Sequence, residues 1–274
     1  MSHDDQAVPT VTVGCEELVA GLHALGLEPG DHVVAHASLS SFGHVQGGAQ
    51  AVVDALLGTL GPRGTLVMPY FFPLYDGVFD SARPPTAYTG AIARQLRAQP
   101  GALLSVHPSH PFVAVGQAAA HITHDHYRAS GVGRDSPVDR LAKLGGKVLL
   151  LGVDQTANTT IHAGEAYAGV AYWGRSRPDR PSGRWIILPT GEQMWQRLPD
   201  TPGDSTGFPR IEPILIERRL VQFGEVGQAT CRLMPAQELI EAVVEYLRRD
   251  PAGLLCDRPG CPFCTWARGL LFRR

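Results

Sequence analysis

Hydrophobic positions along the chain fall into two spacings, which predict helices alternating with buried strands. Leucine and valine recur every three or four residues in 15–26, 47–61 and 234–250, as on the buried face of a helix. The segments 33–35, 64–71 and 145–153 are short continuous apolar runs, typical of strands buried on both faces of a parallel sheet. We therefore expect an α/β fold with a mostly parallel central sheet flanked by helices.

The pattern changes after about residue 174. Proline, glycine and charged residues dominate the stretches 175–183 and 197–213, and the apolar run 184–189 between them predicts a strand. We expect an antiparallel hairpin with long surface loops, inserted over 174–215 into a single domain of residues 1–274. Loops of this length inside a compact domain are usually functional.

Charge and length exclude several classes of protein. The 274 residues include 24 lysines and arginines against 26 aspartates and glutamates, which gives a net charge of −2. This balance argues against nucleic-acid binding through a global positive field. No segment approaches the roughly 20 apolar residues of a membrane helix, and the N-terminal residues do not resemble a signal peptide. We expect a cytoplasmic monomer or homodimer without a nucleic-acid or membrane partner.

Three loops next to the predicted strands concentrate histidine, glycine and hydroxyl side chains. They are HASLSSFGHVQGG (36–48), HPSHPF (107–112) and VDQTANTTIHAGE (153–165). Ligands of parallel α/β sheets bind where the strands end, so three such loops predict a binding cleft. Gly47 and Gly48 open a predicted helix, and the free N–H groups at its start would suit a phosphate or pyrophosphate.

Metal and serine-hydrolase chemistry are disfavoured in these loops. Pro108 and Pro111 break the helix that would place the two histidines of HPSH on one face, and no HExxH motif occurs. The serines near His36 are not followed by a helix in the geometry of a hydrolase nucleophile. The glycine pair lacks the lysine of a Walker loop. We therefore predict no catalytic metal.

Four segments lie in a specific order and at specific separations. They are HASLSSFGHVQGGAQAVVDALLGTLGPRGTLVMPYF (36–71), HPSHPFVAVG (107–116), GRDSPVDRLAKLGGKVLLLGV (133–153) and TTIHAGE (159–165). Together they resemble the aminoglycoside 3-N-acetyltransferase family, from about Val13 to about Ala168 and more loosely to the final helix. The resemblance implies an antibiotic-resistance enzyme with an α/β fold distinct from the GNAT acetyltransferases. Such an enzyme transfers the acetyl group of acetyl-coenzyme A to the 3-amino group of an aminoglycoside.

The resemblance also implies roles for individual residues. His162 of the TTxHxxE motif would be the base that acts on the amine, and Glu165 would be its acidic partner. The loops at 36–48 and 107–112 would line the coenzyme A channel. The residues expected there are His36, Ser38, Leu39, Ser40, Val45, Gly47, His107 and Ser109.

Acyl transfer to an amine explains the need for these residue types. An amine must lose a proton before it attacks a thioester, and histidine, with an unperturbed pKa near ~6.5, is suited to remove it. A carboxylate such as Glu165 would orient the ring and stabilise the imidazolium. Thr160 or a nearby backbone N–H could donate a hydrogen bond to the thioester oxygen. No cysteine lies in the three loops, so direct transfer in a ternary complex needs no acyl-enzyme.

The acceptor pocket is expected between an aromatic wall and the loop-rich insertion. Tyr70 and Phe71 would supply the wall, while Asp179 and Glu212 would supply negative charge from the insertion. The insertion carries arginines as well as acidic residues, so two alternatives stay open. One is acyl transfer to an amine that is not an aminoglycoside, and the other is a coenzyme A-binding protein without turnover.

Two further groups of residues have simple interpretations. Cys256, Cys261 and Cys264 cluster in CDRPGCPFC, but a structural zinc site needs four ligands. Cys231 or a distant histidine could be the fourth; three reduced cysteines in a C-terminal turn are favoured over zinc.

The histidines of the polar stretch 121–126 are expected to be exposed to solvent.

Overall fold

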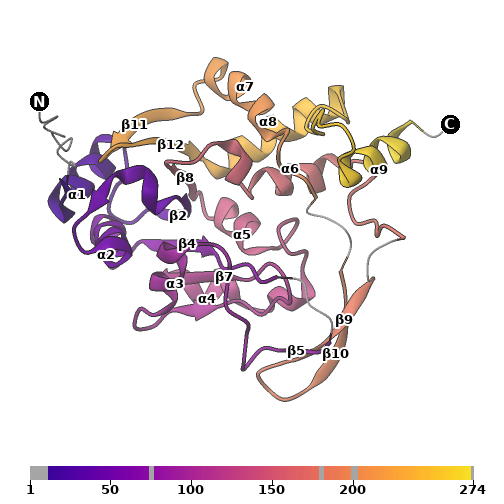
Figure 1. The fold of residues 1–274 in the computed structure, drawn as a ribbon, viewed down its shortest axis with the longest axis horizontal. Helices are drawn as coiled ribbons and strands as arrows, with labels where there is room; N and C mark the ends of the chain where they lie inside the picture. The colour runs from indigo at the N-terminus through magenta and orange to yellow at the C-terminus, as the bar shows by residue number, and fades with distance from the viewer. Residues whose placement is uncertain (1–11, 74–76, 179–181, 199–202, 273–274) are drawn as a thin grey trace, which may run out of the picture.

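A seven-stranded sheet forms the centre of the molecule. The computed structural model describes residues 12–73, 77–178, 182–198 and 203–272. The strand order is β11–β12–β8–β2–β4–β7–β6 (Figure 1). The strands are β2 (His32–Ala37), β4 (Thr65–Pro69), β6 (Leu103–Leu104), β7 (Phe112–Gly116), β8 (Lys147–Leu151), β11 (Gln222–Val226) and β12 (Ala229–Pro235).

The parallel part of the sheet is its centre. β2 pairs in parallel with both β4 and β8, whereas the pairings on either side, through β7 and β6 and through β12 and β11, are antiparallel. The predicted α/β class and flanking helices are confirmed, and the sheet is parallel where the three apolar runs 33–35, 64–71 and 145–153 pair. Of the antiparallel pairs, β6–β7 and β11–β12 are joined directly by short connections, whereas other elements lie between the strands of β4–β7 and β8–β12.

Helices cover both faces of the sheet, as the buried residues of its strands require. Val33 and Ala35 pack into one core cluster and Val34 into the other, because successive side chains of a strand point to opposite faces. The cluster that contains Val33 and Ala35 is covered by α1 (Cys15–Ala24), α2 (Gly48–Leu60) and α3 (Ala91–Arg97). The second is covered by α4 (Ala119–Thr123), α5 (Pro137–Lys143), α6 (Ile161–Ala168), α7 (Glu212–Glu217), α8 (Ala236–Arg249) and α9 (Pro262–Leu271).

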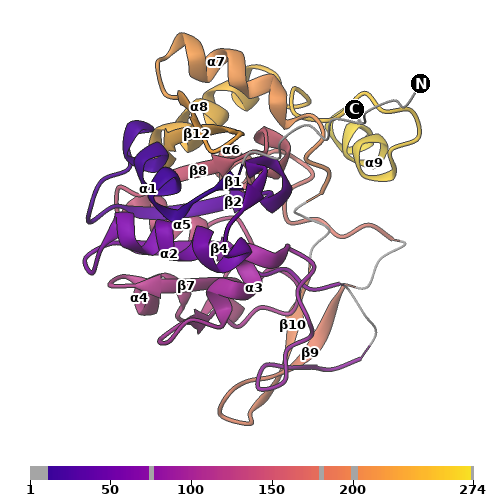
Figure 2. The same cartoon turned by 60° about the vertical axis from the view of Figure 1, so that its left-hand side comes forward.

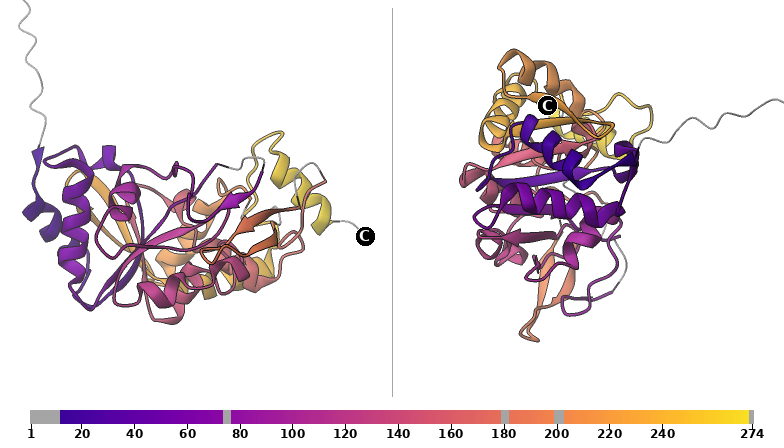
Figure 3. Two further views of the ribbon diagram at one scale, coloured as in Figure 1. Left: turned by 90° about the horizontal axis from the view of Figure 1, so that it is seen from below. Right: turned by 90° about the vertical axis from the view of Figure 1, so that its left-hand side faces the viewer.

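Two small sheets lie outside the central one. The predicted hairpin is present as β9 (Gly183–Ile187) and β10 (Gln193–Arg197), with β5 (Phe79–Asp80) added in parallel to β9. It projects from the end of the molecule that carries β7 (Figures 2 and 3). The other small sheet joins β1 (Thr12–Val13) to β3 (His44–Val45). Within the described residues, no helix combines the length and the apolar character needed to cross a bilayer.

Helix α6 packs closely on α8, and Gly164 permits this contact. A Cβ added at Gly164 would lie 2.3 Å from Cγ1 of Val243. We therefore expect Gly164→Ala to lower the free energy of unfolding by about 1–3 kcal/mol, because the overlap outweighs the gain of about 1 kcal/mol in helix propensity. Urea unfolding measures the change. Gly58→Ala in α2 is the matched control, since no atom lies within 4 Å of its added Cβ, and it should be neutral or stabilising. Equal behaviour of the two variants would contradict the close α6–α8 contact.

Candidate active site

The three loops singled out in the sequence meet at one edge of the sheet. β2, β4 and β8 are parallel, so the segments that follow Ala37, Pro69 and Leu151 leave the sheet at the same edge. β7 runs antiparallel to β4, with Phe112 opposite Pro69, so the segment 107–111 that precedes β7 lies at this edge too. The predicted convergence of the loops is therefore built into the pairing of the strands.

His162 and Glu165 form a buried pair in the first two turns of α6, not in a loop as the sequence suggested. The strand β8 is followed by a short 3-10 turn at Gln155–Ala157, and α6 then begins at Ile161. Residues three apart on a helix lie on the same face, which brings Nδ1 of His162 within 2.5 Å of Oε2 of Glu165. Both side chains are more than nine-tenths buried. Nε2 of His162 has no hydrogen-bond partner among the described residues, so it is the ring atom left to exchange a proton.

Tyr172 and Phe208 also contact this pair, and neither was predicted from the sequence. The Tyr172 hydroxyl donates to Oε1 of Glu165 at 2.8 Å, so each carboxylate oxygen has a partner. Tyr172 is fully buried, and burial together with the Glu165 carboxylate raises its pKa, which keeps it a donor at neutral pH. Phe208 lies edge-on to the His162 ring, with 4.7 Å between ring centroids. No motif marks either residue, because both reach the pair from outside α6.

His36 connects the first loop to the start of α6. Its Nε2 lies 3.2 Å from Oγ1 of Thr159, and burial lowers its pKa to about 3. Next to Thr159, Oγ1 of Thr160 is buried without a hydrogen-bond partner among the described residues. A buried hydroxyl without a partner is costly, which fits a donor reserved for a bound molecule.

The loop before β7 is a rigid turn built around His107. The Nδ1 atom of His107 accepts backbone N–H bonds from His110 at 3.0 Å and from Ser109 at 3.3 Å. His110 in turn lies edge-on to Phe71 at 4.8 Å between ring centroids. Burial, and then the nearby His162, lowers the pKa of His110 to about 3. The turn therefore supports the site with neutral histidines.

His126 was expected to be exposed, and this expectation is wrong. It is fully buried, with Nδ1 2.8 Å from the Ser105 hydroxyl and Nε2 donating to the Gly131 carbonyl at 3.0 Å. Its ring stacks on His107 at 4.8 Å, and burial lowers its pKa to about 3. The polar sequence around it misled the prediction because its partners come from other loops. His121 and His124 are exposed, as expected.

The remaining residues predicted to bind coenzyme A lie in and after the first loop. Ser38 and Ser40 contact each other through their hydroxyls at 3.1 Å, and Ser40 is exposed. Leu39 is half-buried, and Val45 is buried in β3. Gly47 precedes α2 with φ +84°, a conformation that favours glycine. Their contacts with coenzyme A stay predictions.

The residues predicted to bind the acceptor are only partly brought together. Tyr70 and Phe71 follow β4 directly, and Phe71 reaches His110 as described. The Glu212 carboxylate accepts from Nε of Arg232 at 2.7 Å and from the Gln155 side chain at 3.0 Å, so an acceptor would have to share it. Asp179 lies outside the described residues.

The segment GDSTG at 203–207 has the spacing of a serine-hydrolase elbow, which the sequence analysis passed over. Its structural context differs from an elbow, because it forms no strand and leads into a short 3-10 helix, Phe208–Ile211. Asp204 in this segment contacts two cysteines instead. A hydrolase remains disfavoured.

Comparison with known proteins gives a consistent result. A family model described as aminoglycoside 3-N-acetyltransferase matches residues 34–248. The chain is 32% identical to aminoglycoside N(3)-acetyltransferase VII of Streptomyces paromomycinus, over 86% of this chain and 94% of that relative. It is 33% identical to aminoglycoside N(3)-acetyltransferase III of Serratia marcescens, over 85% of this chain and 97% of that relative.

Solved structures of related enzymes share the fold over most of the chain. A histidine-to-alanine mutant of aminoglycoside acetyltransferase AAC(3)-IVa in complex with gentamicin superposes with a TM-score of 0.85 at 31% identity, covering 96% of this chain and all of that one. A binary complex of AAC-IIIb with coenzyme A superposes with a TM-score of 0.73 at 28% identity, covering 87% of this chain and 97% of that one. Because the family model spans most of the chain and these relatives match it over most of its length, this chain belongs to the aminoglycoside 3-N-acetyltransferase family.

Proposed function

We propose that this enzyme transfers the acetyl group of acetyl-coenzyme A to the 3-amino group of an aminoglycoside, with His162 as the general base. The single observation that carries the assignment of the base is the contact of 2.5 Å between Nδ1 of His162 and Oε2 of Glu165. This contact fixes the ring and directs Nε2 to the proton that must be removed. The names of the relatives support the substrate class.

The proposed reaction is a direct transfer in a ternary complex. Nε2 of His162 takes a proton from the 3-ammonium group or from the attacking amine, whose lone pair then adds to the thioester carbonyl. Glu165 stabilises the imidazolium, and Tyr172 keeps the carboxylate in place through the bond of 2.8 Å. The tetrahedral intermediate collapses as its C–S bond breaks, and the coenzyme A thiolate leaves and takes up a proton.

Thr160 fits the role of a donor to the oxyanion. Its hydroxyl lies two residues before His162 and is buried without a partner among the described residues. A preorganised donor of this kind is worth most where negative charge develops on the carbonyl oxygen. A backbone N–H at the start of α6 could share the role, as the positive end of a helix favours an anion.

The acceptor site of this proposal lies between the loop after β4 and the insertion at 174–215. Tyr70 and Phe71 supply an apolar wall, and the edge contact of Phe71 with His110 puts this wall next to the histidine turn. Glu212, together with Asp179, is retained as an acidic contact for the ammonium groups. The cytoplasmic location, the monomeric or homodimeric state and the single-domain organisation belong to the same proposal.

The experiment is release of the coenzyme A thiol from acetyl-coenzyme A in the presence of a panel of aminoglycosides. We expect release only when both substrates are present, and NMR of the product should place the acetyl group on the 3-amino nitrogen. A matched aminoglycoside whose 3-amino group is already acetylated serves as the control and should give no release. Release with the blocked compound would refute the regiochemistry.

The two alternatives give different results in this assay. A coenzyme A-binding protein without turnover would bind acetyl-coenzyme A, as measured by calorimetry, but release no thiol with any amine. An acyltransferase for another amine would release thiol with amines from other classes and not with aminoglycosides. The buried contact between His162 and Glu165 favours turnover, because a protein that only binds coenzyme A has no use for an oriented base.

A further inference from the structure

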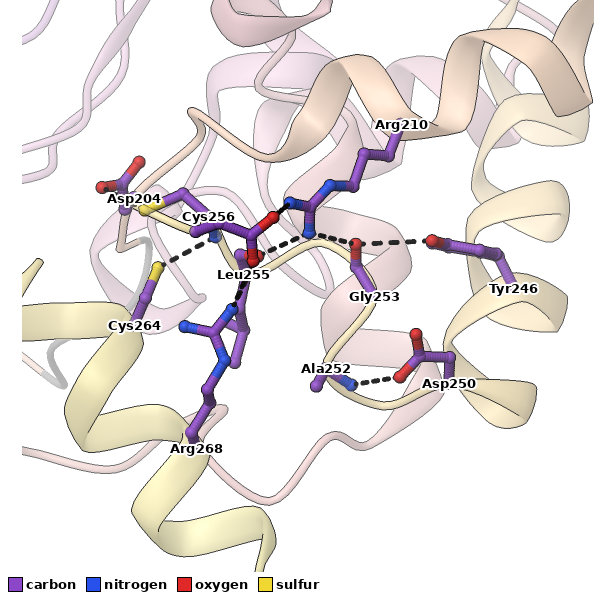
Figure 4. Close-up of polar contacts among 11 residues, drawn as sticks. Asp204, Arg210, Tyr246, Asp250, Ala252, Gly253, Leu255, Cys256, Cys264 and Arg268 are labelled. Atoms are coloured by element: carbon purple, nitrogen blue, oxygen red, sulfur yellow. Dashed lines mark hydrogen bonds and ion pairs between the residues drawn. The ribbon is translucent and has the colours of Figure 1, made fainter. Parts of the chain in front are cut away.

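Four side chains with metal-binding atoms gather at the C-terminal end of the molecule. They are Asp204, Cys256, Cys261 and Cys264, and one ligand atom from each lies within 4.8 Å of every other. The three cysteines are buried, and Asp204 comes from a segment more than 50 residues earlier in the chain. Figure 4 shows Asp204 beside the sulfur of Cys256, and the sulfur of Cys264, on helix α9, pointing toward the Cys256 backbone nitrogen.

We propose that Asp204, Cys256, Cys261 and Cys264 bind a structural Zn²⁺ ion. Zinc in structural sites takes four ligands in a tetrahedron, prefers thiolates, and accepts carboxylate oxygen as well. The sequence left the fourth ligand open between Cys231 and a histidine. Cys231 lies in β12, on the opposite face of the sheet from the three cysteines, and its thiol donates to the Ala229 carbonyl, so it is not the fourth ligand. The fourth ligand is Asp204.

The geometry of the cluster is close to that of a zinc site. Ligand atoms around zinc at bond lengths of about 2.3 Å lie roughly 3.8 Å apart. Oδ2 of Asp204 already lies 2.9 Å from Sγ of Cys261 and 3.5 Å from Sγ of Cys256. Small movements of the side chains therefore suffice to bring the three sulfur atoms and Oδ2 of Asp204 to bonding distance from one zinc ion. The other carboxylate oxygen, Oδ1, accepts the N–H of Thr206 at 2.7 Å, which fixes Oδ2 toward the sulfurs.

Groups around the cluster suit a negatively charged zinc site. Three thiolates and one carboxylate around Zn²⁺ carry a net charge of −2, and the Arg258 guanidinium lies 2.9 Å from Oδ2 of Asp204 and 3.8 Å from Sγ of Cys261. The backbone N–H of Cys256 donates to Sγ of Cys264 at 3.3 Å, and a hydrogen bond of this kind orients a metal-binding thiolate. Cys261 directly precedes α9, and the positive end of that helix favours thiolates.

The proposed ion would connect the C-terminal helix to the candidate active site. Phe263, between two of the cysteines, packs edge-on against Tyr172 with 5.7 Å between ring centroids. Asp204 is four residues before Phe208, which lies against His162. The cluster thus holds two segments whose aromatic rings rest on the His162–Glu165–Tyr172 group, and its role is to position these segments.

The decisive measurement is the metal content of the wild-type chain, purified without metal-affinity resin or chelator. Elemental analysis should give about one zinc ion per chain, and titration with an organomercurial should release it as the thiols react. Replacement of zinc by Co²⁺ should give the intense visible absorption of a tetrahedral cobalt thiolate. Because these readouts need no turnover, they stay independent of the proposed acetyl transfer.

Variants identify the ligands. Asp204→Ala and Cys261→Ser should lower the zinc content or weaken binding at least tenfold, whereas Asp204→Cys, which keeps four ligands, should retain it. Cys15→Ser, at the exposed cysteine outside the cluster, is the matched control and should keep full zinc. If Cys261→Ser does not fold, the wild-type measurement and Asp204→Cys still decide.

Two results would overturn the proposal. One is a wild-type chain with far less than stoichiometric zinc that also fails to take up Zn²⁺ or Co²⁺ after complete reduction. The other is a native mass that shows a disulfide between two of the three cysteines in place of metal. A zinc-bound chain that acetylates no aminoglycoside would leave this proposal intact and refute only the proposed function.

Discussion

His162→Ala should lower kcat for acetyl transfer by about 10²–10⁴-fold, the usual contribution of a positioned general base. The amine then has no group that takes its proton, while the binding of acetyl-coenzyme A should change little. Thiol release at saturating concentrations of both substrates gives kcat, and calorimetry gives the affinity for acetyl-coenzyme A.

His121→Ala is the matched control for this variant, because His121 is an exposed histidine outside the site. It should retain full activity. If His162→Ala instead keeps wild-type kcat and changes only KM, then His162 binds substrate and is not the base. If both variants lose activity together, the loss comes from destabilisation, which urea unfolding would reveal.

Glu165→Gln should lower kcat by about 10²–10⁴-fold, although the substitution barely changes the volume of the side chain. The amide cannot stabilise an imidazolium as a carboxylate does, and its NH₂ group can turn the ring to the wrong tautomer, as in the triad of serine proteases. The contact of 2.5 Å between Glu165 and His162 makes the pair sensitive to this change. The measurement is kcat as a function of pH.

Two companion variants sharpen this prediction. Tyr172→Phe removes the donor to Oε1 and leaves the carboxylate charged, so a smaller loss of roughly tenfold is expected. Glu217→Gln makes the same chemical change on an exposed face of α7 and should have no effect. Wild-type activity in Glu165→Gln would show that the carboxylate is only structural.

The sequence predicted helices α1, α2 and α8 and the central strands well, because each depends on the local spacing of apolar residues, but it did not predict α5, α7 or α9. Helix α8 and strand β8 lie where the periodicity placed them. The antiparallel edges were not predictable in the same way, since an apolar run does not reveal the direction of its partner strand. The position of His162 in a helix was missed because TTIHAGE has too few apolar residues to show a helical period.

The candidate site was predictable only as far as it lies in continuous motifs. His162 and Glu165 are three residues apart, so one motif contains both. Tyr172, Phe208 and Asp204 join their partners through tertiary packing from segments without a signature of their own. His126 was mispredicted for the same reason: its neighbours in the sequence are polar, but tertiary packing buries its side chain.

The buried histidines bear on how a polycation can approach this site. Burial places the pKa of His36, His110 and His126 at about 3, and that of His107 well below 6.5. These four rings are therefore uncharged at neutral pH and in mild acid. A substrate with several ammonium groups therefore meets no positive charge, and no electrostatic repulsion, from these four rings. Lysine or arginine in the same positions would raise an electrostatic barrier against the molecule that the enzyme must admit.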